Sequence, residues 1–280
     1  MSKDFKKRVL VLHGYAQNGN LFSKRIAGLR KQAKDIDMVI LDAPHILKAE
    51  DLFEDSEVNE DPGSALRGWW KFSDAAKTIC VGMEETLLTL RDLLMEQRFD
   101  GVFGFSQGAG LACLLSAILE RPESYPGFLI DNKPVHPPFE YCISAAGFKS
   151  RDLISDRILS EGFSTPTLHI VGRTDNIISP EYTKSILDVS RNKRVEEHDG
   201  GHYIPSKAPW RKFLVEYMRR GPEGDVASPS SATSETPTPT PSGAATPLGD
   251  GSATAAEAEE KEMAETAVSS AAAPAGSLTS

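Results

Sequence analysis

The sequence predicts an α/β domain with a mainly parallel sheet, followed by a disordered C-terminal tail. Short, continuously apolar runs that end at glycine or proline are typical of strands buried on both faces of a parallel sheet. Segments with apolar residues at helical spacing alternate with these runs, which is the order of a βαβ chain. The composition then changes near residue 220, because no Phe, Trp or Tyr occurs between Gly221 and Ser280.

Five apolar strands and a shorter sixth are expected, with right-handed connections between parallel neighbours. Their sequences are RVLVLHG, DMVILDAP, FDGVFGF, FEYCISAAG, TPTLHIVGRTD and KRVEEH. Helical spacing is seen over residues 20–34, 78–97, 106–120, 180–191 and 206–219. The long segment from His45 to Asp74 lacks clean periodicity, and a loop of this length is commonly functional, for example as a lid.

The segment 221–280 has the composition of a disordered tail. It is rich in Pro, Ser, Thr and Ala, so it cannot bury enough apolar surface to offset the entropy of ordering it. Its nine acidic residues and one lysine give −8 of the total charge of −9, which leaves residues 1–220 at about −1. We therefore expect a folded domain over residues 1–220 and an acidic tail over 221–280.

Composition and charge exclude several classes of function. A nearly neutral domain lacks the basic surface that nucleic-acid phosphates require. No apolar run reaches the roughly 18 residues of a membrane span, and the N-terminal residues lack a signal-peptide pattern, which predicts the cytoplasm with the nucleus as the alternative. Cys80, Cys113 and Cys142 form no CxxC pair, which favours buried, reduced thiols over disulfides or a zinc site.

Reactive side chains follow the ends of several predicted strands, where ligands bind in open parallel sheets. The GFSQG motif around Ser106 fits GxSxG, a sharp strand-to-helix turn that exposes a nucleophilic serine. Gly104 and Gly108 are expected there because the turn leaves no room for a Cβ. The residues after the other strands are His13, Gly14 and Tyr15, then Asp175, then His202.

A serine hydroxyl needs a neighbouring base, and the predicted base is His202. Asp175, after the preceding strand, is expected to hold the imidazole tautomer and stabilise its protonated form. The chain order Ser106, Asp175, His202 is that of hydrolases built on this kind of sheet. The backbone N–H groups of Tyr15 and Gln107 are the expected donors to an oxyanion.

Each of these residues also has a structural alternative. Ser106 is also suited to be a helix N-cap, and Asp175 to be an ordinary turn residue. Asp199 competes with Asp175 as the acid, but it is disfavoured because it precedes the histidine in the same loop. A metal pair formed by His198 and His202 is disfavoured by the two glycines between them, so no metal or cofactor is expected. His169 is expected to be a packed core residue.

The motifs VLVLHGYAQNG, LRGWW, GFSQGAG, GRTDNIISP and GGHYIP together resemble the FSH family of serine hydrolases. These are fungal-type α/β-hydrolases, related to the human ovarian-cancer-associated serine hydrolase. The resemblance covers residues 8–217 and implies the α/β-hydrolase fold with Ser106, Asp175 and His202 as the triad. It also implies hydrolysis of esters or thioesters. Some relatives encoded beside polyketide synthases release an acyl chain from a carrier thioester.

Trp69, Trp70 and Phe105 are the expected substrate-binding residues. Aromatic side chains on a cover loop are suited to an apolar acyl pocket, although the two tryptophans are equally suited to anchoring the loop. The expected partner is a small-molecule ester or an acyl thioester, in one version presented by a carrier protein. The alternative function is a catalytically silent interaction module that uses its acidic tail. A peptidase or lipase is disfavoured because no extra domain or strongly apolar lid is apparent.

Overall fold

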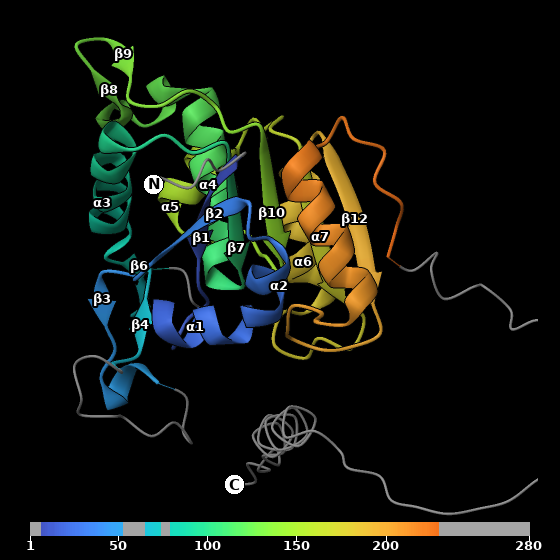
Figure 1. Ribbon diagram of the computed structural model, residues 1–280. Coiled ribbons are helices and arrows are strands. Elements are labelled where there is room, and N and C mark those ends of the chain that lie inside the picture. Colours follow the sequence, from blue (N-terminus) through green and yellow to red (C-terminus); the bar gives the residue numbers. More distant parts are fainter. Residues whose placement is uncertain (1–6, 53–64, 74–78, 230–280) are drawn as a thin grey trace, which may run out of the picture. The chain divides into compact units, whose positions relative to one another are not determined.

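A computed structural model describes residues 7–52, 65–73 and 79–229, all within one compact unit, Met1–Glu235. Strands and helices alternate around a central six-stranded sheet (Figure 1). The strand order is β12-β11-β10-β7-β1-β2, and every neighbouring pair is parallel. The strands are β1 (Lys7–Leu12), β2 (Ile36–Leu41), β7 (Gly101–Phe105), β10 (Tyr141–Ala145), β11 (Thr167–Gly172) and β12 (Lys193–His198). The predicted α/β fold is confirmed.

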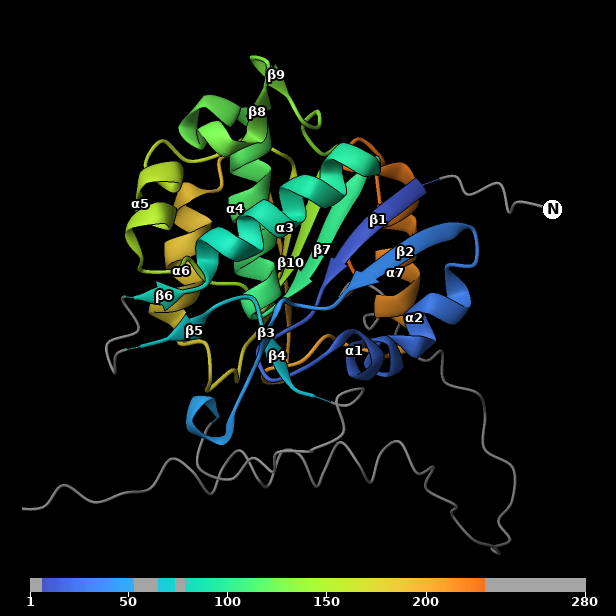
Figure 2. The same cartoon turned by 90° about the vertical axis from the view of Figure 1, so that its left-hand side faces the viewer.

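Helices cover both faces of this sheet, as the view in Figure 2 shows. One layer contains α3 (Met83–Glu96), α4 (Gln107–Glu120), α5 (Leu153–Leu159) and α6 (Pro180–Val189). The other contains α1 (Gly19–Arg25), α2 (Ala27–Gln32) and α7 (Ala208–Arg220). The sheet is therefore the middle layer of a three-layer domain.

The continuous apolar runs in the strands follow from this layering. Successive side chains of a strand point to opposite faces. In β1, Leu10 and Leu12 pack in the core beneath α3 and α4, whereas Val9 and Val11 pack in the core beneath α1 and α7. Both faces of the strand are buried, so no polar residue alternates with the apolar ones.

Three helices differ from the sequence-based expectation. The helix expected over residues 78–97 begins only at Met83, because Cys80 and Val81 form the short strand β6 and Gly82 turns the chain with a φ of 89°. The helix expected over residues 20–34 is broken at Ile26, which ends α1 and begins α2 with φ −96° and ψ 16°. The short helix α5 was not expected, because its seven residues give little room for helical periodicity. Its N-cap is Asp152, whose carboxylate accepts the N–H of Ser155 at 2.9 Å.

The long segment between β2 and α3 contains short two-stranded ladders where it is described. It includes the 3₁₀ turn η1 (Ala49–Asp51), and its ladders pair β3 (His45–Ile46) with β4 (Arg67–Gly68) and β5 (Lys71–Phe72) with β6 (Cys80–Val81). The remaining parts of the expected lid, residues 53–64 and 74, lie outside the described residues, as do residues 75–78.

The proline-rich connection between α4 and β10 also contains short elements. They are the 3₁₀ turns η3 (Pro122–Ser124) and η4 (Pro126–Phe128) and a hairpin of β8 (Leu129–Ile130) with β9 (Lys133–Pro134). Asp131 and Asn132 turn this hairpin with φ of 51° and 58°. Two consecutive positive φ angles are the geometry of a type I′ turn.

Beyond α7, the described chain runs alongside β12 as far as Pro229 (Figure 1). Val226 is buried, and its carbonyl accepts Nη1 of Arg194 at 2.7 Å. The hydroxyl of Ser228 donates to Glu196 Oε2 at 2.6 Å. The division into a domain over 1–220 and a disordered tail over 221–280 stays a prediction, since residues 230–280 are not described. Of the helices described, none has the length and apolar character needed to span a membrane.

Candidate active site

Ser106 lies at a sharp turn between β7 and α4. Its φ of 53° and ψ of −117° belong to a region that non-glycine residues seldom adopt. Its N–H donates to the carbonyl of Ala145 at 2.9 Å, which ties the turn to the end of β10. A Cβ on Gly104 would overlap the carbonyl oxygen of Gly108, and a Cβ on Gly108 would overlap that of Leu12. Tight packing at this turn therefore requires both glycines, as the motif predicted.

Ser106, His202 and Asp175 come from distant parts of the chain and form a hydrogen-bonded series with His202 in the middle. Nε2 of His202 lies 3.0 Å from Oγ of Ser106, and Nδ1 of His202 lies 2.8 Å from Oδ2 of Asp175. With the ring proton on Nδ1 donated to the carboxylate, Nε2 is left to accept the serine hydroxyl proton. Ser106 occupies the N-cap position of α4, but its side chain makes no capping hydrogen bond there.

The carboxylate of Asp175 is buried and held from two sides. Its side chain is 5% exposed, and while Oδ2 faces His202, Oδ1 accepts the N–H groups of Ile177 and Ile178, each at 2.9 Å. Burial alone raises the pKa of Asp175. The hydrogen bond and charge of His202, with the two backbone N–H groups, outweigh burial and lower that pKa below its usual value. The carboxylate is therefore ionised at neutral pH.

The competing acid, Asp199, lies elsewhere. Its side chain is 90% exposed and forms an ion pair with Nη1 of Arg173 at 2.6 Å. His198 is buried among rings, 4.9 Å from the centroid of Tyr203 and 5.8 Å from that of Trp210. In the part of the chain that is described, no group of three or more His, Cys, Asp or Glu side chains is arranged to hold a metal ion. His169 is buried in β11, as expected for a core residue.

The loop after β1 is fixed by the imidazole of His13. Nδ1 of this ring donates to the carbonyl of Gly14 at 2.7 Å, and Nε2 accepts the N–H of Ala43 at 3.1 Å. Burial lowers the pKa of His13, which favours the neutral ring that can accept at Nε2. The N–H of Gly14 donates to Oε1 of Gln17 at 3.0 Å. These contacts set the direction of the chain as it reaches Tyr15.

Both expected oxyanion donors come from adjacent strands of the sheet. Tyr15 follows β1, and Gln107 follows β7 as the first residue of α4. Leu12 pairs with Gly104 across these strands. The first N–H groups of a helix have no intrahelical acceptor and carry a partial positive charge. The assignment of these two N–H groups to an oxyanion hole stays a prediction.

Trp69 and Trp70 are fully buried, at 0% and 1% exposure. Oε1 of Gln107 accepts the N–H of Trp69 at 2.8 Å, and Nε2 of Gln107 donates to the carbonyl of Trp70 at 2.9 Å. Nε1 of Trp69 donates to the carbonyl of His13 at 2.8 Å. These contacts are those of an anchor. A substrate-binding role for either tryptophan stays a prediction.

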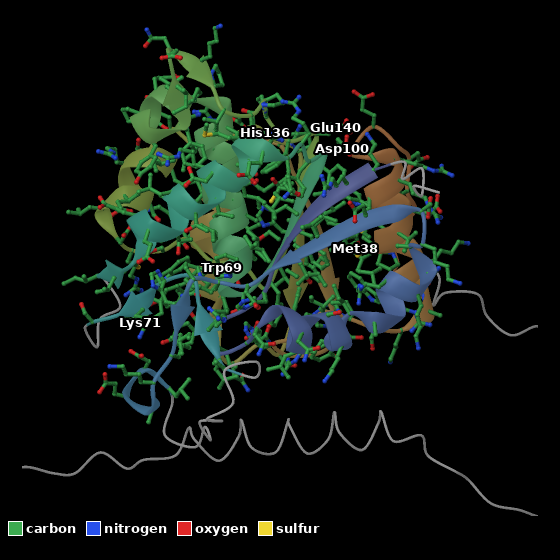
Figure 3. All side chains as sticks on the ribbon, turned by 60° about the vertical axis from the view of Figure 1, so that its left-hand side comes forward. Met38, Trp69, Lys71, Asp100, His136 and Glu140 are labelled. Carbon is green, nitrogen blue, oxygen red and sulfur yellow. The ribbon has the colours of Figure 1, made fainter. Side chains whose placement is uncertain are left out.

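Figure 3 places Trp69 and Lys71 toward one end of the sheet and Asp100 and Glu140 toward the other. Since Asp100 directly precedes β7, the tryptophan side is the end at which the strands finish. The sequence contained no signal for the role of the Gln107 side chain, because it depends on a contact with a segment 38 residues away.

Phe105 supports the imidazole of His202. Its ring is buried, stacks on Phe22 at a centroid distance of 6.1 Å and lies 5.0 Å from the centroid of the His202 ring. A row of further rings lies around Trp70, whose centroid is 6.3 Å from Phe72 and 6.4 Å from Phe148. Direct contact between Phe105 and substrate stays a prediction.

Comparison with known proteins gives matches over most of this chain. The family model described as "Serine hydrolase (FSH1)" matches residues 1–214. Esterase CG5412 of Drosophila melanogaster is 33% identical over 223 residues, which cover 76% of this chain and 74% of the fly protein. Esterase OVCA2 of Xenopus tropicalis is 32% identical over 223 residues, which cover 75% of this chain and 91% of the frog protein.

Solved structures match as well. A carboxylesterase from Mesorhizobium loti superposes with a TM-score of 0.51 at 14% identity, covering 77% of this chain and 90% of the bacterial one. At this identity the likeness establishes the fold alone.

Proposed function

Because this chain belongs to the FSH1 family of serine hydrolases, we propose that it hydrolyses carboxylic esters or thioesters through an acyl-Ser106 intermediate. Membership of the family confirms the resemblance carried by the sequence motifs. The observation that carries the proposed mechanism is the hydrogen-bonded series Ser106, His202, Asp175.

In the proposed acylation step, Nε2 of His202 takes the hydroxyl proton as Oγ of Ser106 attacks the carbonyl carbon. The imidazolium that forms is stabilised by the adjacent Asp175 carboxylate. Burial raises the pKa of Asp175, but the contact with His202 outweighs burial and helps to lower that pKa. Collapse of the tetrahedral intermediate breaks the bond to the leaving group, and His202 returns its proton to the departing oxygen or sulfur. The acyl group is then held on Ser106.

Deacylation repeats this chemistry with water as the nucleophile. His202 accepts a proton from water as the water oxygen attacks the acyl carbon. It then protonates Oγ of Ser106 as the carboxylic acid leaves. In both halves the negative oxygen receives hydrogen bonds from the N–H groups of Tyr15 and Gln107, which we propose as the oxyanion hole.

We propose that the acyl group is apolar. Five rings follow one another near the carboxyl ends of the strands, with successive centroid distances of 6.2, 6.3, 6.4 and 6.1 Å in the order Tyr15, Phe72, Trp70, Phe148, Tyr182. Phe72 and Tyr182 are partly exposed. Aromatic surface of this kind favours an alkyl or aryl chain over a charged one.

The leaving group is an alcohol or a thiol in this proposal. The thiol version includes a carrier-protein thioester of the kind used in polyketide synthesis, and it uses the same residues because only the departing atom changes. A comparison of matched acyl esters and acyl thioesters on the full chain separates these versions.

The first test is hydrolysis of p-nitrophenyl esters from acetyl to palmitoyl by the full chain, with Ser106→Ala as the control. We expect a Ser106-dependent rate that increases with chain length, and labelling of Ser106 by a fluorophosphonate. A Ser106→Ala chain as active as the wild type would contradict the proposed mechanism. A folded wild type that neither turns over esters or thioesters nor reacts with the fluorophosphonate would favour the interaction-module alternative.

A further inference from the structure

Gln107 does more than supply a backbone N–H beside the nucleophile. Its side-chain amide clamps two successive residues of the cover segment, defined as residues 65–73. It accepts the N–H of Trp69 at 2.8 Å and donates to the carbonyl of Trp70 at 2.9 Å. Gln107 is 1% exposed, so both bonds are shielded from water.

Trp69 makes a second link, to the loop after β1. Its indole Nε1 donates to the carbonyl of His13 at 2.8 Å, and its ring centroid lies 5.2 Å from that of the His13 imidazole. Its carbonyl accepts the hydroxyl of Thr86 in α3. Its three polar groups are therefore bonded to three different elements. Two of these, the loop after β1 and the start of α4, hold the proposed oxyanion donors.

The same segment touches the loop at another point. The N–H of Arg67 donates to the carbonyl of Gln17 at 2.8 Å, and Oε1 of Gln17 accepts the N–H of Gly14. The cover segment thus lies both against the loop after β1, which contains Tyr15, and against the turn at Ser106. It bridges two parts of the chain that are about 90 residues apart in sequence.

We propose that Gln107 and Trp69 form a positioning relay that sets the separation of the Tyr15 and Gln107 N–H donors. The relay runs from the His13 carbonyl through the indole and backbone N–H groups of Trp69 to the amide of Gln107. It rests on the proposed function, because the donors matter only if an oxyanion forms there. Preorganised donors stabilise a developing charge only while their positions are held.

The relay predicts a specific kinetic signature. Trp69→Phe keeps a ring but removes the indole N–H. Gln107→Met keeps the length of the side chain but removes both hydrogen bonds of the side-chain amide. With a p-nitrophenyl ester we expect either change to lower kcat about 10- to 100-fold, while KM changes by less than about twofold. The kcat of the double variant is expected to fall no further than that of the less active single variant, because each change breaks the same relay.

Two controls separate the relay from simple anchoring. Thr86→Val removes the hydrogen bond to the Trp69 carbonyl. This hydrogen bond anchors the cover segment but is not part of the relay. Trp210→Phe removes an indole N–H from the opposite helical layer. Both controls are expected to keep kcat within about threefold of wild type even where the thermal midpoint falls. Affinity for a trifluoromethyl ketone, which forms an oxyanion on Ser106, should fall in parallel with kcat in the relay variants only.

Several results would overturn this inference while leaving the proposed function standing. They are unchanged kcat in the relay variants, a rise in KM alone, multiplicative losses in the double variant, or an equal loss of kcat in Thr86→Val. If Gln107→Met fails to fold, Trp69→Phe with the two controls remains decisive, since it keeps every backbone bond. A wild type without Ser106-dependent hydrolysis would instead overturn the proposed function, and this inference with it.

Discussion

Oδ2 of Asp175 lies 2.8 Å from Nδ1 of His202, and the aspartate side chain is only 5% exposed. Asp199, three residues from the same histidine, faces solvent and pairs with Arg173. The aspartate nearer to His202 in sequence, Asp199, is therefore not its partner. The partner is Asp175, which follows the neighbouring strand. The contrast between these two aspartates supplies a matched pair for mutation.

Replacing Asp175 by asparagine should impair turnover far more than the same change at Asp199. An amide at residue 175 favours the wrong imidazole tautomer, so we expect kcat to fall about 10³- to 10⁴-fold. Asp199→Asn removes one exposed ion pair and should change kcat by less than about twofold. Steady-state ester hydrolysis by both variants checks this, and comparable losses in the two would show that Asp175 has no special role.

Stability should depend on pH through Asp175. Burial raises the pKa of Asp175, but the His202 contact and two backbone N–H groups outweigh burial. Together they lower this pKa in the folded chain below its usual value of 3.8. A depressed carboxyl pKa stabilises the fold above the unfolded-state pKa, and this stabilisation is lost as the pH falls through the folded-state pKa. The difference in unfolding free energy between wild type and Asp175→Asn should therefore be constant above about pH 5 and shrink below pH 4.

Urea titrations of both chains from pH 7 to pH 3 measure this difference. A gap that widens on acidification would have the opposite sign and would show that the carboxylate is not stabilised in the folded state.

Gly108→Ala should disrupt the nucleophile turn. The added Cβ would overlap the carbonyl oxygens of Leu12 and His13, which belong to backbone that has little room to shift. We expect a loss of roughly 1–3 kcal/mol or more in unfolding free energy, together with loss of hydrolysis. Gly127→Ala is the control, because the nearest atom to its new Cβ lies at 3.4 Å. Denaturant midpoints decide, and a Gly108→Ala chain as stable as Gly127→Ala would refute the packing argument.

Truncation after Pro229 should be less harmful than truncation after Arg220. The segment between them buries Val226 and adds the contacts from Arg194 and Ser228. Its removal should cost about 1–2 kcal/mol net, which lowers Tm by about 2–8 °C in a domain of this size. Calorimetry of the two truncated chains checks this, and equal Tm values would place the boundary at residue 220.

Much of the site could be predicted because its parts follow strand ends. A strand end, a glycine and a reactive side chain recur at Ser106, Asp175 and His202, and the parallel sheet brings the ends of its strands to one edge. The two glycines of the GFSQG turn were predictable for the same reason, since a sharp turn imposes a local steric demand.

Other features give a weak local signal or depend on contacts between distant segments. The break at Ile26 occurs without glycine or proline at that residue. The helix α5 is too short for a periodic signal and depends on the Asp152 cap. The amide of Gln107 meets the cover segment only after α4 and residues 65–73 have packed together. This last contact belongs to tertiary structure and is absent from the composition of any window.

The hydrogen bond between Ser106 and His202 joins residues 96 positions apart, and Asp175 lies between them in sequence. During synthesis, the serine leaves the ribosome long before its histidine has been translated. A nascent chain ending near residue 190 already contains the GFSQG sequence, but it lacks His202 as a base to activate the hydroxyl. Contacts between residues so far apart in sequence carry a loop-closure cost that slows folding. Reactivity toward a fluorophosphonate would therefore report the completed domain, and pulse labelling of arrested chains would date the moment at which the nucleophile becomes competent.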